Sequence, residues 1–353
     1  MVQRTAAAVV ALLACVGALS ACGSSDKDAG AGESGGGGSI TVAGFGGAYG
    51  DAEKAAYYDP FTNATGIKVK ILQAEPSLGA VELQVKRKNV IWDIAELAGP
   101  DQITACSNGS LEKVDYKQVR KADLAAGKGF ECGIVSSSFT EGIGYRTDKL
   151  HKPPTWQDFF DTQRFPGKRT MEKYIQDGTL EYALLGDGVA KEGLYPLDLD
   201  RAIRKMEGLG DDLVLVDSLA QASQLLSSGD AAMIQTASGR IIPLKNAGLP
   251  VDFAPIGLRA DSAFTIPKGA KNAANAQKFL AFIASCASCS QTMARLTAYS
   301  GPNKNGADGL SAAQKALLPT SPTVIAQAPA QDNQWWSENG AKAQAAFDKF
   351  ANR

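Results

Sequence analysis

Apolar and polar positions alternate in regular blocks through the first third of the chain, and each block has the period of a strand or a helix. Residues 67–71, for example, alternate apolar side chains with Lys68 and Lys70, which is the period of a half-buried strand. The blocks predict strands over 40–42, 67–71 and 90–97, and helices over 51–61 and 77–89. This order is typical of an α/β lobe with a largely parallel sheet.

The remainder of the chain continues this alternation without an internal repeat. Thr155 and Asp158 form a capping box at the start of one helix, and Gly208 and Gly229 end two later ones. We expect strands over 142–150, 231–234, 250–257 and 262–269, and helices that begin near 153 and cover 196–208, 217–229, 272–296 and 334–353.

One buried strand, residues 231–234, ends in small residues and then reaches a cation. The sequence from Thr236 to Gly239 is Thr-Ala-Ser-Gly, and Arg240 follows before the apolar pattern resumes. Two interpretations are open. Either Arg240 turns to solvent at a strand end, or the small residues clear space for a site in which its guanidinium holds an anionic group.

The N-terminal segment predicts export. Arg4 precedes a short apolar stretch that ends in small residues and is too short to span a membrane. Residues 19–22, Leu-Ser-Ala-Cys, resemble a bacterial lipobox, which predicts a signal peptide over 1–21 and a diacylglyceryl group on Cys22. The alternative is ordinary cleavage nearby and an incidental cysteine. Residues 22–39 are rich in Gly and Ser and predict a flexible tether before a soluble domain.

The composition mainly excludes some classes of binding partner. The whole chain has 36 Lys and Arg against 37 Asp and Glu, and this near-neutral balance gives no case for binding nucleic acid or an acidic bilayer. No second apolar segment is long enough to span a membrane, so we expect membrane contact only through the lipid anchor. The roughly 310 residues after the tether usually form two lobes rather than one.

Cysteine usage agrees with export. Apart from the signal-peptide cysteine and Cys22, four cysteines remain, and an even number suggests disulfides in an oxidising compartment. Four cysteines allow three pairings. We favour Cys106–Cys132, which closes a loop of about 25 residues and stabilises by about 3 kcal/mol in the chain-entropy model. A bridge between Cys286 and Cys289 is the weaker expectation, because i,i+3 positions of a regular helix strain disulfide geometry.

Several stretches occur along the chain in a particular order, including GFGGAYGDAEKAAYYDPFTNATGIKV, IWDIAELAGPD, PPTWQDFFDTQRFPGKR, LYPLDLDRAIRKM, AQASQLLSSGDAAM and YSGPNKN. Together they resemble the extracellular solute-binding proteins of ABC importers, in the branch that includes spermidine- and putrescine-binding proteins. The resemblance implies the type II periplasmic-binding-protein fold. In this α/β fold each of two lobes has a mixed, largely parallel sheet flanked by helices, and the ligand cleft lies between the lobes.

The same resemblance sets the expected domain organisation. Two strands, near 142–146 and 262–266, would cross between the lobes. The first lobe would contain residues 40–143 and 262–305, and the second lobe residues 144–261 and 306–353. Clefts between lobes and the carboxyl ends of strands are the usual places for small-molecule sites.

The first loop of the predicted cleft carries four candidate binding residues. Phe45, Gly46, Gly47 and Tyr49 match a family loop in which an aromatic residue, two glycines and a tyrosine enter the cleft. Two glycines let backbone N–H groups approach a ligand closely. The alternative is a tight strand-to-helix turn with Phe45 in the core.

Further candidates follow from later stretches of the resemblance. Ala98 and Gly99 fall where the family contacts ligand, and Tyr299 matches a pocket tyrosine, although it could equally be a packing residue. Ser218 and Gln221 match the Ser and Gln of a family stretch, and helix capping explains Ser218 equally well.

The departures from the family pattern indicate the ligand. Polyamine binders carry an acid at the position of Arg240 and surround their ligand with Trp, whereas Leu215, Val216 and Ala237 stand where related members often have Trp. A guanidinium binds carboxylate or phosphonate through two parallel hydrogen bonds. We therefore expect an anionic or zwitterionic solute, resembling an amino acid, aminobutyrate or an aminophosphonate. Asp261 could meet its amine, unless Asp261 caps a turn.

The expected function is that of a lipid-anchored binding protein on the outer face of the cell membrane, which delivers its solute to the permease of an ABC importer. The expected protein is a monomer that needs no cofactor and no metal. Two other readings stay open. One is a polyamine-binding protein, and the other is a sensor that binds the same ligand without a transport role.

Enzymatic activity has little support. His151, in a proline-bounded turn, is the only histidine from which a catalytic triad or a histidine-rich metal site could be built. Cys286-Ala-Ser-Cys289 is a CxxC motif, which raises thiol oxidoreductase chemistry. Redox pairs of this kind normally lie at a helix N-terminus, where the thiol pKa is lowered. This pair falls inside a predicted helix, which favours a structural bridge or free thiols.

Overall fold

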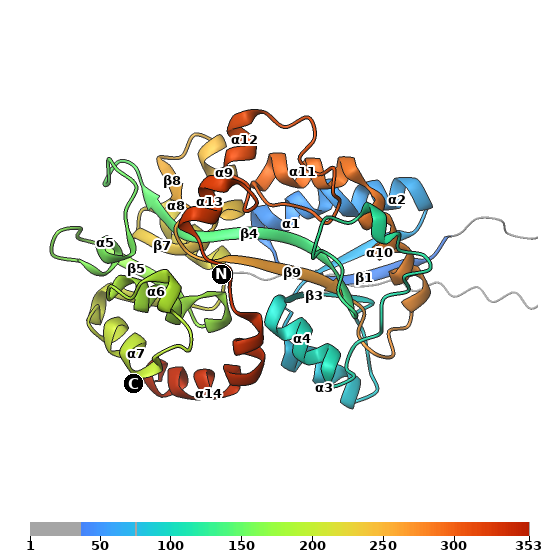
Figure 1. Ribbon diagram of the computed structural model, residues 1–353, viewed down its shortest axis with the longest axis horizontal. Coiled ribbons are helices and arrows are strands. Elements are labelled where there is room, and N and C mark those ends of the chain that lie inside the picture. The colour runs from blue at the N-terminus through green and yellow to red at the C-terminus, as the bar shows by residue number, and fades with distance from the viewer. Residues whose placement is uncertain (1–36, 75, 353) are drawn as a thin grey trace, which may run out of the picture. The chain divides into compact units, whose positions relative to one another are not determined.

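Nine strands form one hydrogen-bonded sheet in residues 37–74 and 76–352, the part of the chain that the computed structural model describes (Figure 1). The strands are β1 Ser39–Gly44, β2 Lys68–Gln73, β3 Ile94–Ala98, β4 Gly133–Arg146, β5 Lys168–Glu172, β6 Leu213–Val216, β7 Ala231–Ala237, β8 Val251–Ala254 and β9 Arg259–Thr265. Their order is β2-β1-β3-β9-β4-β7-β5-β6, and β8 pairs with β4. The predicted signal peptide, Cys22 and most of the predicted tether lie outside the described residues.

Helices connect these strands. In the first half they are α1 Gly47–Glu53, the π-helix η1 Lys54–Tyr58, α2 Asp59–Thr65, α3 Leu78–Lys86, α4 Gly99–Ser107, η2 Lys121–Asp123, α5 Trp156–Phe160, η3 Ile175–Asp177 and α6 Thr179–Gly186. In the second half they are η4 Lys191–Gly193, α7 Leu199–Glu207, η5 Gly210–Asp212, α8 Leu219–Ser228, α9 Ser238–Asn246, α10 Ala273–Ser285, α11 Ala287–Thr297, α12 Ala312–Ala316, α13 Pro322–Gln327 and α14 Asn333–Ala351.

The strand β4 belongs to both halves of the sheet. Its residues Gly133–Thr140 pair with β9, whereas Glu141–Arg146 pair with β7 and β8. We call the half that contains β1, β2 and β3 the first lobe, and the half that contains β5, β6 and β7 the second lobe. Within each lobe the central pairs are parallel, β1 with β2 and β3, and β5 with β6 and β7. The antiparallel strands β4 and β9 run side by side through the centre (Figure 1).

Each lobe has its own hydrophobic core. In the first lobe, buried side chains of β1 and β3 such as Ile40 and Ile94 pack with aromatic residues of the flanking helices, including Phe61 and Phe279. In the second lobe, Trp156 stacks on Tyr182 at 4.2 Å between ring centroids, within a core that also takes in the C-terminal helix α14. Burial of these apolar side chains is what holds each lobe together.

Several helix termini confirm the sequence predictions. The Thr155–Asp158 capping box is present in both directions, and Gly208 and Gly229 form the C-caps of α7 and α8 as predicted. Gly66 forms the C-cap of α2 in the same way. Gly66 and Gly229 have positive φ angles of 71° and 87°, a conformation that glycine adopts without steric cost. These positions could be recognised because capping depends on local chemistry.

Other element boundaries were predicted wrongly. The helix expected over 272–296 is two helices, α10 and α11, separated by Cys286 with φ −83° and ψ 91°. The apolar period continues across the break because Phe279, Ile283, Cys289 and Met293 all face the same core. The strand expected over 90–97 begins only at Ile94.

Two further boundaries also differ. The helix expected over 51–61 starts four residues earlier and ends four residues later, and it includes the π-helical segment η1. The strand expected over 231–234 continues to Ala237, after which α9 begins at once.

The helix α14 returns from the second lobe toward the first. It packs against α7 of the second lobe and against α4 of the first lobe. Gly99, the first residue of α4, makes room for this contact, because a Cβ there would lie 2.6 Å from Asn333 Nδ2. Among the described residues, no helix combines the length and apolar character that crossing a bilayer requires.

Candidate functional site

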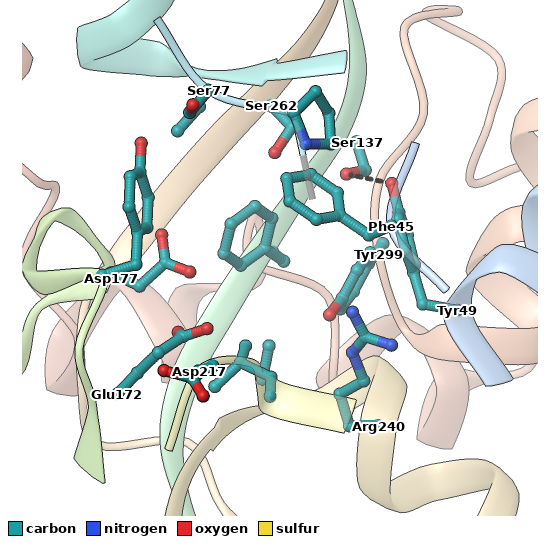
Figure 2. A pocket seen from close by; sticks show the side chains of 16 residues that line it. Phe45, Tyr49, Ser77, Ser137, Glu172, Asp177, Asp217, Arg240, Ser262 and Tyr299 are labelled. Carbon is teal, nitrogen blue, oxygen red and sulfur yellow. Dashed lines mark hydrogen bonds between the residues drawn. The ribbon is translucent and has the colours of Figure 1, made fainter. Parts of the chain in front are cut away.

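A pocket lies between the two lobes, where β4 and β9 pass from one to the other (Figure 2). Its cavity volume is about 220 Å³, which is below the 300–1,000 Å³ typical of sites for drug-sized ligands. The lining comes from strand ends and helix starts, as expected for α/β sheets. It consists of Phe45, Tyr49, Pro76, Ser77, Ala98, Ser137, Phe139, Glu172, Tyr174, Asp177, Asp217, Leu219, Ala237, Arg240, Ser262 and Tyr299.

The loop after β1 forms one wall. Phe45 and Tyr49 line the pocket, whereas the two glycines between them do not. Gly47 has φ of 68°, and a Cβ there would lie 3.2 Å from Arg240 Nη1. Gly46 is the N-cap of α1 and its carbonyl oxygen accepts a hydrogen bond from Arg240 Nη1. The predicted glycines therefore position Arg240 rather than lining the cavity.

Arg240 is buried in the site, so the solvent-facing interpretation is wrong. Its side chain is 6% exposed, and it stands in the first turn of α9, directly after β7 ends at Ala237. Its guanidinium centre lies 5.6 Å from the centroid of the Tyr49 ring, in a cation–π arrangement. A guanidinium has five N–H donors, and a helix N-terminus favours negative charge. This wall is suited to an anion.

A buried hydrogen-bond network fixes Tyr49. Its hydroxyl donates to Glu96 Oε1 at 2.6 Å and lies 3.0 Å from Ser137 Oγ. Burial raises the pKa of Tyr49 well above its usual value, and the neighbouring carboxyl groups of Glu53 and Glu96 raise it further. Tyr49 is therefore a neutral phenol whose ring is held in place under Arg240.

Aromatic rings fill the centre of the site. Tyr299 lies 5.4 Å from Tyr49 and 5.3 Å from Phe139 between ring centroids, and Phe45 lies 6.4 Å from Tyr49. Burial raises the pKa of Tyr299, so it too is neutral. Phe139 was not predicted, because no family position suggested it.

Acidic side chains line the other wall. Glu172 is the last residue of β5, Asp177 the last of η3, and Asp217 joins β6 to α8, all in the second lobe. They lie across the pocket from Arg240 (Figure 2). Asp217 Oδ1 also pairs with Lys173 Nζ at 2.8 Å near the surface. One wall is thus cationic and the opposite wall acidic.

Hydrogen bonds between the lobes close the structure around this pocket. The Tyr174 hydroxyl donates to Asp101 Oδ2 at 3.0 Å, and Asp101 Oδ2 also accepts from Leu78 N at the start of α3. On the arginine side, Ser238 Oγ donates to the carbonyl oxygen of Thr297 at 3.1 Å. The structure therefore has the lobes in contact on both sides of the cavity.

Three predicted binding residues have other partners. The Asp261 carboxylate accepts from Ser138 Oγ and forms an ion pair with Lys128 Nζ at 3.0 Å, and it does not line the pocket. The amine that Asp261 meets is therefore that of Lys128 in this chain, and not that of a ligand. Ser218 caps α8 by accepting from Gln221 N at 3.2 Å, and Gln221 Oε1 accepts from Asp217 N. Both residues shape the loop that carries Asp217.

Of the three remaining predicted residues, two line the pocket and one does not. Ala98, the last residue of β3, and Tyr299 line the pocket as expected. Gly99 does not, because it begins α4 and faces Asn333. The acidic wall was missed, although Glu172 and Asp217 follow strands whose carboxyl ends meet at the cleft, which is the signal that could have found them.

Both expected disulfides are present in the structure. Cys106–Cys132 has a Cα–Cα distance of 5.7 Å and Cys286–Cys289 one of 5.2 Å. Cys286 is the N-cap of α11, and its Sγ accepts from Cys289 N at 3.2 Å. The prediction that this pair lies inside a helix is therefore wrong, and the helix break relieves the strain expected for i,i+3 cysteines. Neither pair lines the pocket.

Among the described residues, no cluster of three His, Cys, Asp or Glu side chains is arranged to hold a metal ion. The site instead combines a buried guanidinium, aromatic rings and carboxylates in a small cavity between two α/β lobes. Such a combination is typical of a protein that encloses a small charged solute.

Comparison with known proteins agrees with this class. Residues 56–320 match the family described as bacterial extracellular solute-binding protein. The chain is 31% identical over 323 residues to the gamma-aminobutyric acid-binding protein of Pseudomonas aeruginosa, covering 89% of this chain and 91% of that relative. The protein belongs to the bacterial extracellular solute-binding proteins, which bind small molecules outside the cytoplasm.

Solved structures show the same fold. The binding protein AgtB of A. tumefaciens R10, in complex with agropinic acid, aligns with a TM-score of 0.85 at 27% identity and covers 90% of this chain and 99% of its own. The Atu4243-GABA receptor aligns with a TM-score of 0.75 at 30% identity, covering 88% and 97%. The predicted periplasmic-binding-protein fold is thus confirmed.

Proposed function

We propose that this protein captures a small zwitterionic solute between its lobes, with a carboxylate or phosphonate at Arg240 and an ammonium group toward the acidic wall. The observation that carries the proposal is the opposition of charges across one small cavity. Arg240 stands on one side, and Glu172, Asp177 and Asp217 on the other.

Size and polarity narrow the ligand class. A cavity of about 220 Å³ suits a molecule with few heavy atoms, and the rings of Phe45, Phe139 and Tyr299 suit a short apolar chain between the two charged ends. Burial of the guanidinium strengthens its interaction with an anion, because little water remains to screen it. An ω-amino acid such as γ-aminobutyrate has this form.

The relatives support the same class. The Pseudomonas aeruginosa relative is a gamma-aminobutyric acid-binding protein, and one of the solved structures is that of a GABA receptor. The predicted polyamine alternative has less support, because a diamine would place one ammonium group beside a buried guanidinium, which costs free energy. A diamine is therefore the comparison compound in the test below.

A matched set of ligands tests the charge requirement. Isothermal titration of the purified protein should give the highest affinity for γ-aminobutyrate, which carries both charges. Butyrate and butylamine each lack one charge, and putrescine replaces the carboxylate by a second amine. Each should bind at least tenfold more weakly, since 1.4 kcal/mol corresponds to about tenfold. Tight binding of putrescine with weak binding of γ-aminobutyrate would refute the proposal.

Variants of Arg240 test the residue itself. Arg240→Ala should weaken binding by more than about tenfold, because a buried charged pair that loses one partner costs about 2–5 kcal/mol. Arg240→Lys should recover only part, since an ammonium lacks the two parallel donors. Arg146→Lys is the matched control, because Arg146 binds Asp148 outside the pocket. An unchanged affinity in Arg240→Ala would remove Arg240 from the site.

We further propose that the protein is a lipid-anchored monomer on the outer face of the cell membrane, which passes its ligand to the permease of an ABC importer. The support is the family, together with the lipobox-like residues 19–22 and the Gly/Ser-rich residues after them. Cys22→Ala should leave the protein unprocessed or release it from the membrane fraction. Unchanged processing and fractionation of that variant would contradict the anchor.

Transport and sensing are separated by a different measurement. Uptake of radiolabelled γ-aminobutyrate by cells that lack this protein should fall if it feeds an importer. Restoration by the wild-type gene and not by Arg240→Ala would connect uptake to the pocket. Unchanged uptake would favour the sensor alternative.

A further inference from the structure

Two carboxyl groups are buried together beneath the arginine wall of the pocket. Glu53, at the end of α1, and Glu96, in β3, are 1% and 0% exposed. Glu53 Oε2, the Tyr58 hydroxyl and Glu96 Oε2 lie 3.4, 3.6 and 3.8 Å from the position that a Cβ on Gly44 would occupy. The two carboxyl groups thus converge on a residue that has no side chain to separate them.

A β-bulge in β4 completes the surroundings of Glu96. Consecutive side chains of a regular strand point to opposite faces, but β4 shifts register against β9 between Val135 and Ser137. As a result Ser136 and Ser137 reach the same network. Ser136 Oγ donates to Glu96 Oε1 at 2.5 Å, and Ser137 Oγ contacts the Tyr49 hydroxyl, which donates to the same oxygen.

Arg240 is the cation that acts on this pair, through the Tyr49 ring that it covers. Its charge favours the ionised form of Glu96. The titratable and charged groups that face the pair come from α1, η1, α9 and the segment after α11, and they are Tyr49, Tyr57, Tyr58, Arg240 and Tyr299. The phenols are neutral, so one positive charge faces two carboxyl groups.

Two ionised carboxylates beside one cation would leave a net negative charge in a buried volume, which is unfavourable. Burial raises the pKa of Glu53 well above its usual value, and the charge of Glu96 raises it further. Burial also raises the pKa of Glu96, although its hydrogen bonds oppose this. The pair therefore holds one proton on Glu53 and one negative charge on Glu96, which balances Arg240.

We propose that this carboxyl pair is coupled to the ligand site and takes up a proton from solvent when an anionic ligand binds at Arg240. The inference rests on the proposed function, in which Arg240 receives the anionic group. The ligand then supplies the negative charge that Glu96 supplied before. Glu96 is left as an excess buried charge, and the proton adds at Oε2, the oxygen that neither Tyr49 nor Ser136 uses.

Proton uptake gives the affinity a definite pH dependence. The complex holds the proton more strongly than the free protein, so affinity is highest at low pH and falls as pH rises through the range in which the pair titrates. The limit for one proton is about tenfold per pH unit.

Titration calorimetry measures the proton directly. Binding of γ-aminobutyrate to the purified protein is measured in buffers of different ionisation enthalpy. The observed binding enthalpy is plotted against the ionisation enthalpy of the buffer, and the slope of this line gives the number of protons taken up. We expect uptake in the wild type, and uptake near zero in the double variant Glu53→Gln/Glu96→Gln, which leaves no carboxyl group of the pair to titrate and keeps an oxygen for Tyr49 and Ser136. Glu181→Gln is the matched control, because Glu181 is a buried carboxyl group of the second lobe bonded to Tyr195 and Trp336. Equal uptake in the wild type and in Glu53→Gln/Glu96→Gln would overturn the proposal.

Infrared spectroscopy tests the pair without a ligand. The neutral carboxylic acid of Glu53 should give a C=O stretch, separate from the carboxylate bands, that disappears in Glu53→Gln and persists in Glu181→Gln at acidic pH. If γ-aminobutyrate fails to bind while this band is present, the proposed ligand is wrong, whereas the assignment of one proton to the Glu53–Glu96 pair is retained. If γ-aminobutyrate binds through Arg240 without proton uptake, or the band is absent from the wild type at neutral pH, the coupling is refuted.

Discussion

The hydroxyl of Tyr174 in the second lobe donates to Asp101 Oδ2 of the first lobe across 3.0 Å, beside the ligand pocket. Asp101 is 3% exposed, and the same oxygen also holds Leu78 N at the first turn of α3. Asp101 Oδ2 therefore has one partner in its own lobe, Leu78 N, and one in the other lobe, the Tyr174 hydroxyl.

Tyr174→Phe should weaken this closure. The ring still fills the pocket wall, but the bond to a buried carboxylate is lost, and such bonds contribute about 1.5–3 kcal/mol. Ligand dissociation should accelerate by about tenfold or more, as measured by stopped-flow fluorescence. Tyr116→Phe is the control, because it removes a hydroxyl that bonds Phe130 O within the first lobe. Equal dissociation rates in Tyr174→Phe and wild type would show that the bond does not hold the lobes.

Gly239→Ala should displace Tyr299, one of the residues that line the pocket. A Cβ on Gly239 would lie 2.7 Å from Cζ and 2.9 Å from the hydroxyl oxygen of Tyr299, which lines the cavity. The ring must move toward the ligand, so we expect a loss of affinity of about tenfold with the fold retained. Gly79→Ala, in α3 with no atom within 4 Å of its Cβ, should keep the wild-type affinity and gain about 0.5–1 kcal/mol in stability. Calorimetry and thermal unfolding measure both quantities.

Glu181 should make stability depend on pH. Burial raises the pKa of Glu181 from 4.5 to about 7, although Tyr195 and Trp336 donate to its Oε1. Because the folded pKa is raised, the stabilisation is complete below the unfolded value and is lost as pH rises through the folded value. The loss between about pH 4.5 and 7 is on the order of 3 kcal/mol by linkage.

Glu181→Gln keeps an oxygen for both donors and removes the titration. Its free energy of unfolding, measured by urea denaturation, should therefore fall less steeply over this window than that of the wild type. Glu53 and Glu141 have raised pKa values for the same reason, so part of the slope should remain. A slope identical to the wild type would show that Glu181 is not the group that titrates.

The two disulfides should contribute unequally to stability. Cys106 and Cys132 are separated by 26 residues and Cys286 and Cys289 by 3. In the chain-entropy model the longer loop contributes about 3.5 kcal/mol and the shorter one about 1.6 kcal/mol. Replacing each pair by serines should therefore lower the melting temperature more for the first pair. The reverse order would indicate that the break between α10 and α11 depends on its disulfide.

Regular periodicity made much of the fold predictable. The caps at Thr155 and Gly229 report local geometry, and the structure confirms them. The strand predicted over 67–71 is present as β2, although Ile71 is exposed rather than buried. Strand β5 was missed because its sequence, Lys-Arg-Thr-Met-Glu, looks exposed. Its Arg169 is fully buried, with Nε and Nη1 donating to the carbonyl oxygens of Phe159 and Gly167 at 2.7 and 2.6 Å. When tertiary contacts bury a charged side chain such as Arg169, the sequence shows no periodic pattern from which the strand could be predicted.

The candidate site was predictable on one wall only. Arg240 and Tyr299 stood out because small residues and family motifs surround them. The acidic wall depends on β5 and β6, and neither strand was predicted, so Glu172 and Asp217 had no place in the cleft. Asp261 was chosen by its position near a crossover, whereas its true partner, Lys128, is remote in sequence and became visible only when β4 and β9 paired.

The contact between α14 and α4 gives this protein a built-in optical reporter. Trp335 and Trp336 follow Asn333, which touches the first turn of α4, so two of the four tryptophans stand next to the seam between the lobes. Trp335 is half-buried there, and its emission depends on how much water reaches its ring. Separation of the lobes would admit water at this seam, and closure would expel it. Lobe movement should therefore change the intrinsic fluorescence of α14, which can be measured without an attached dye.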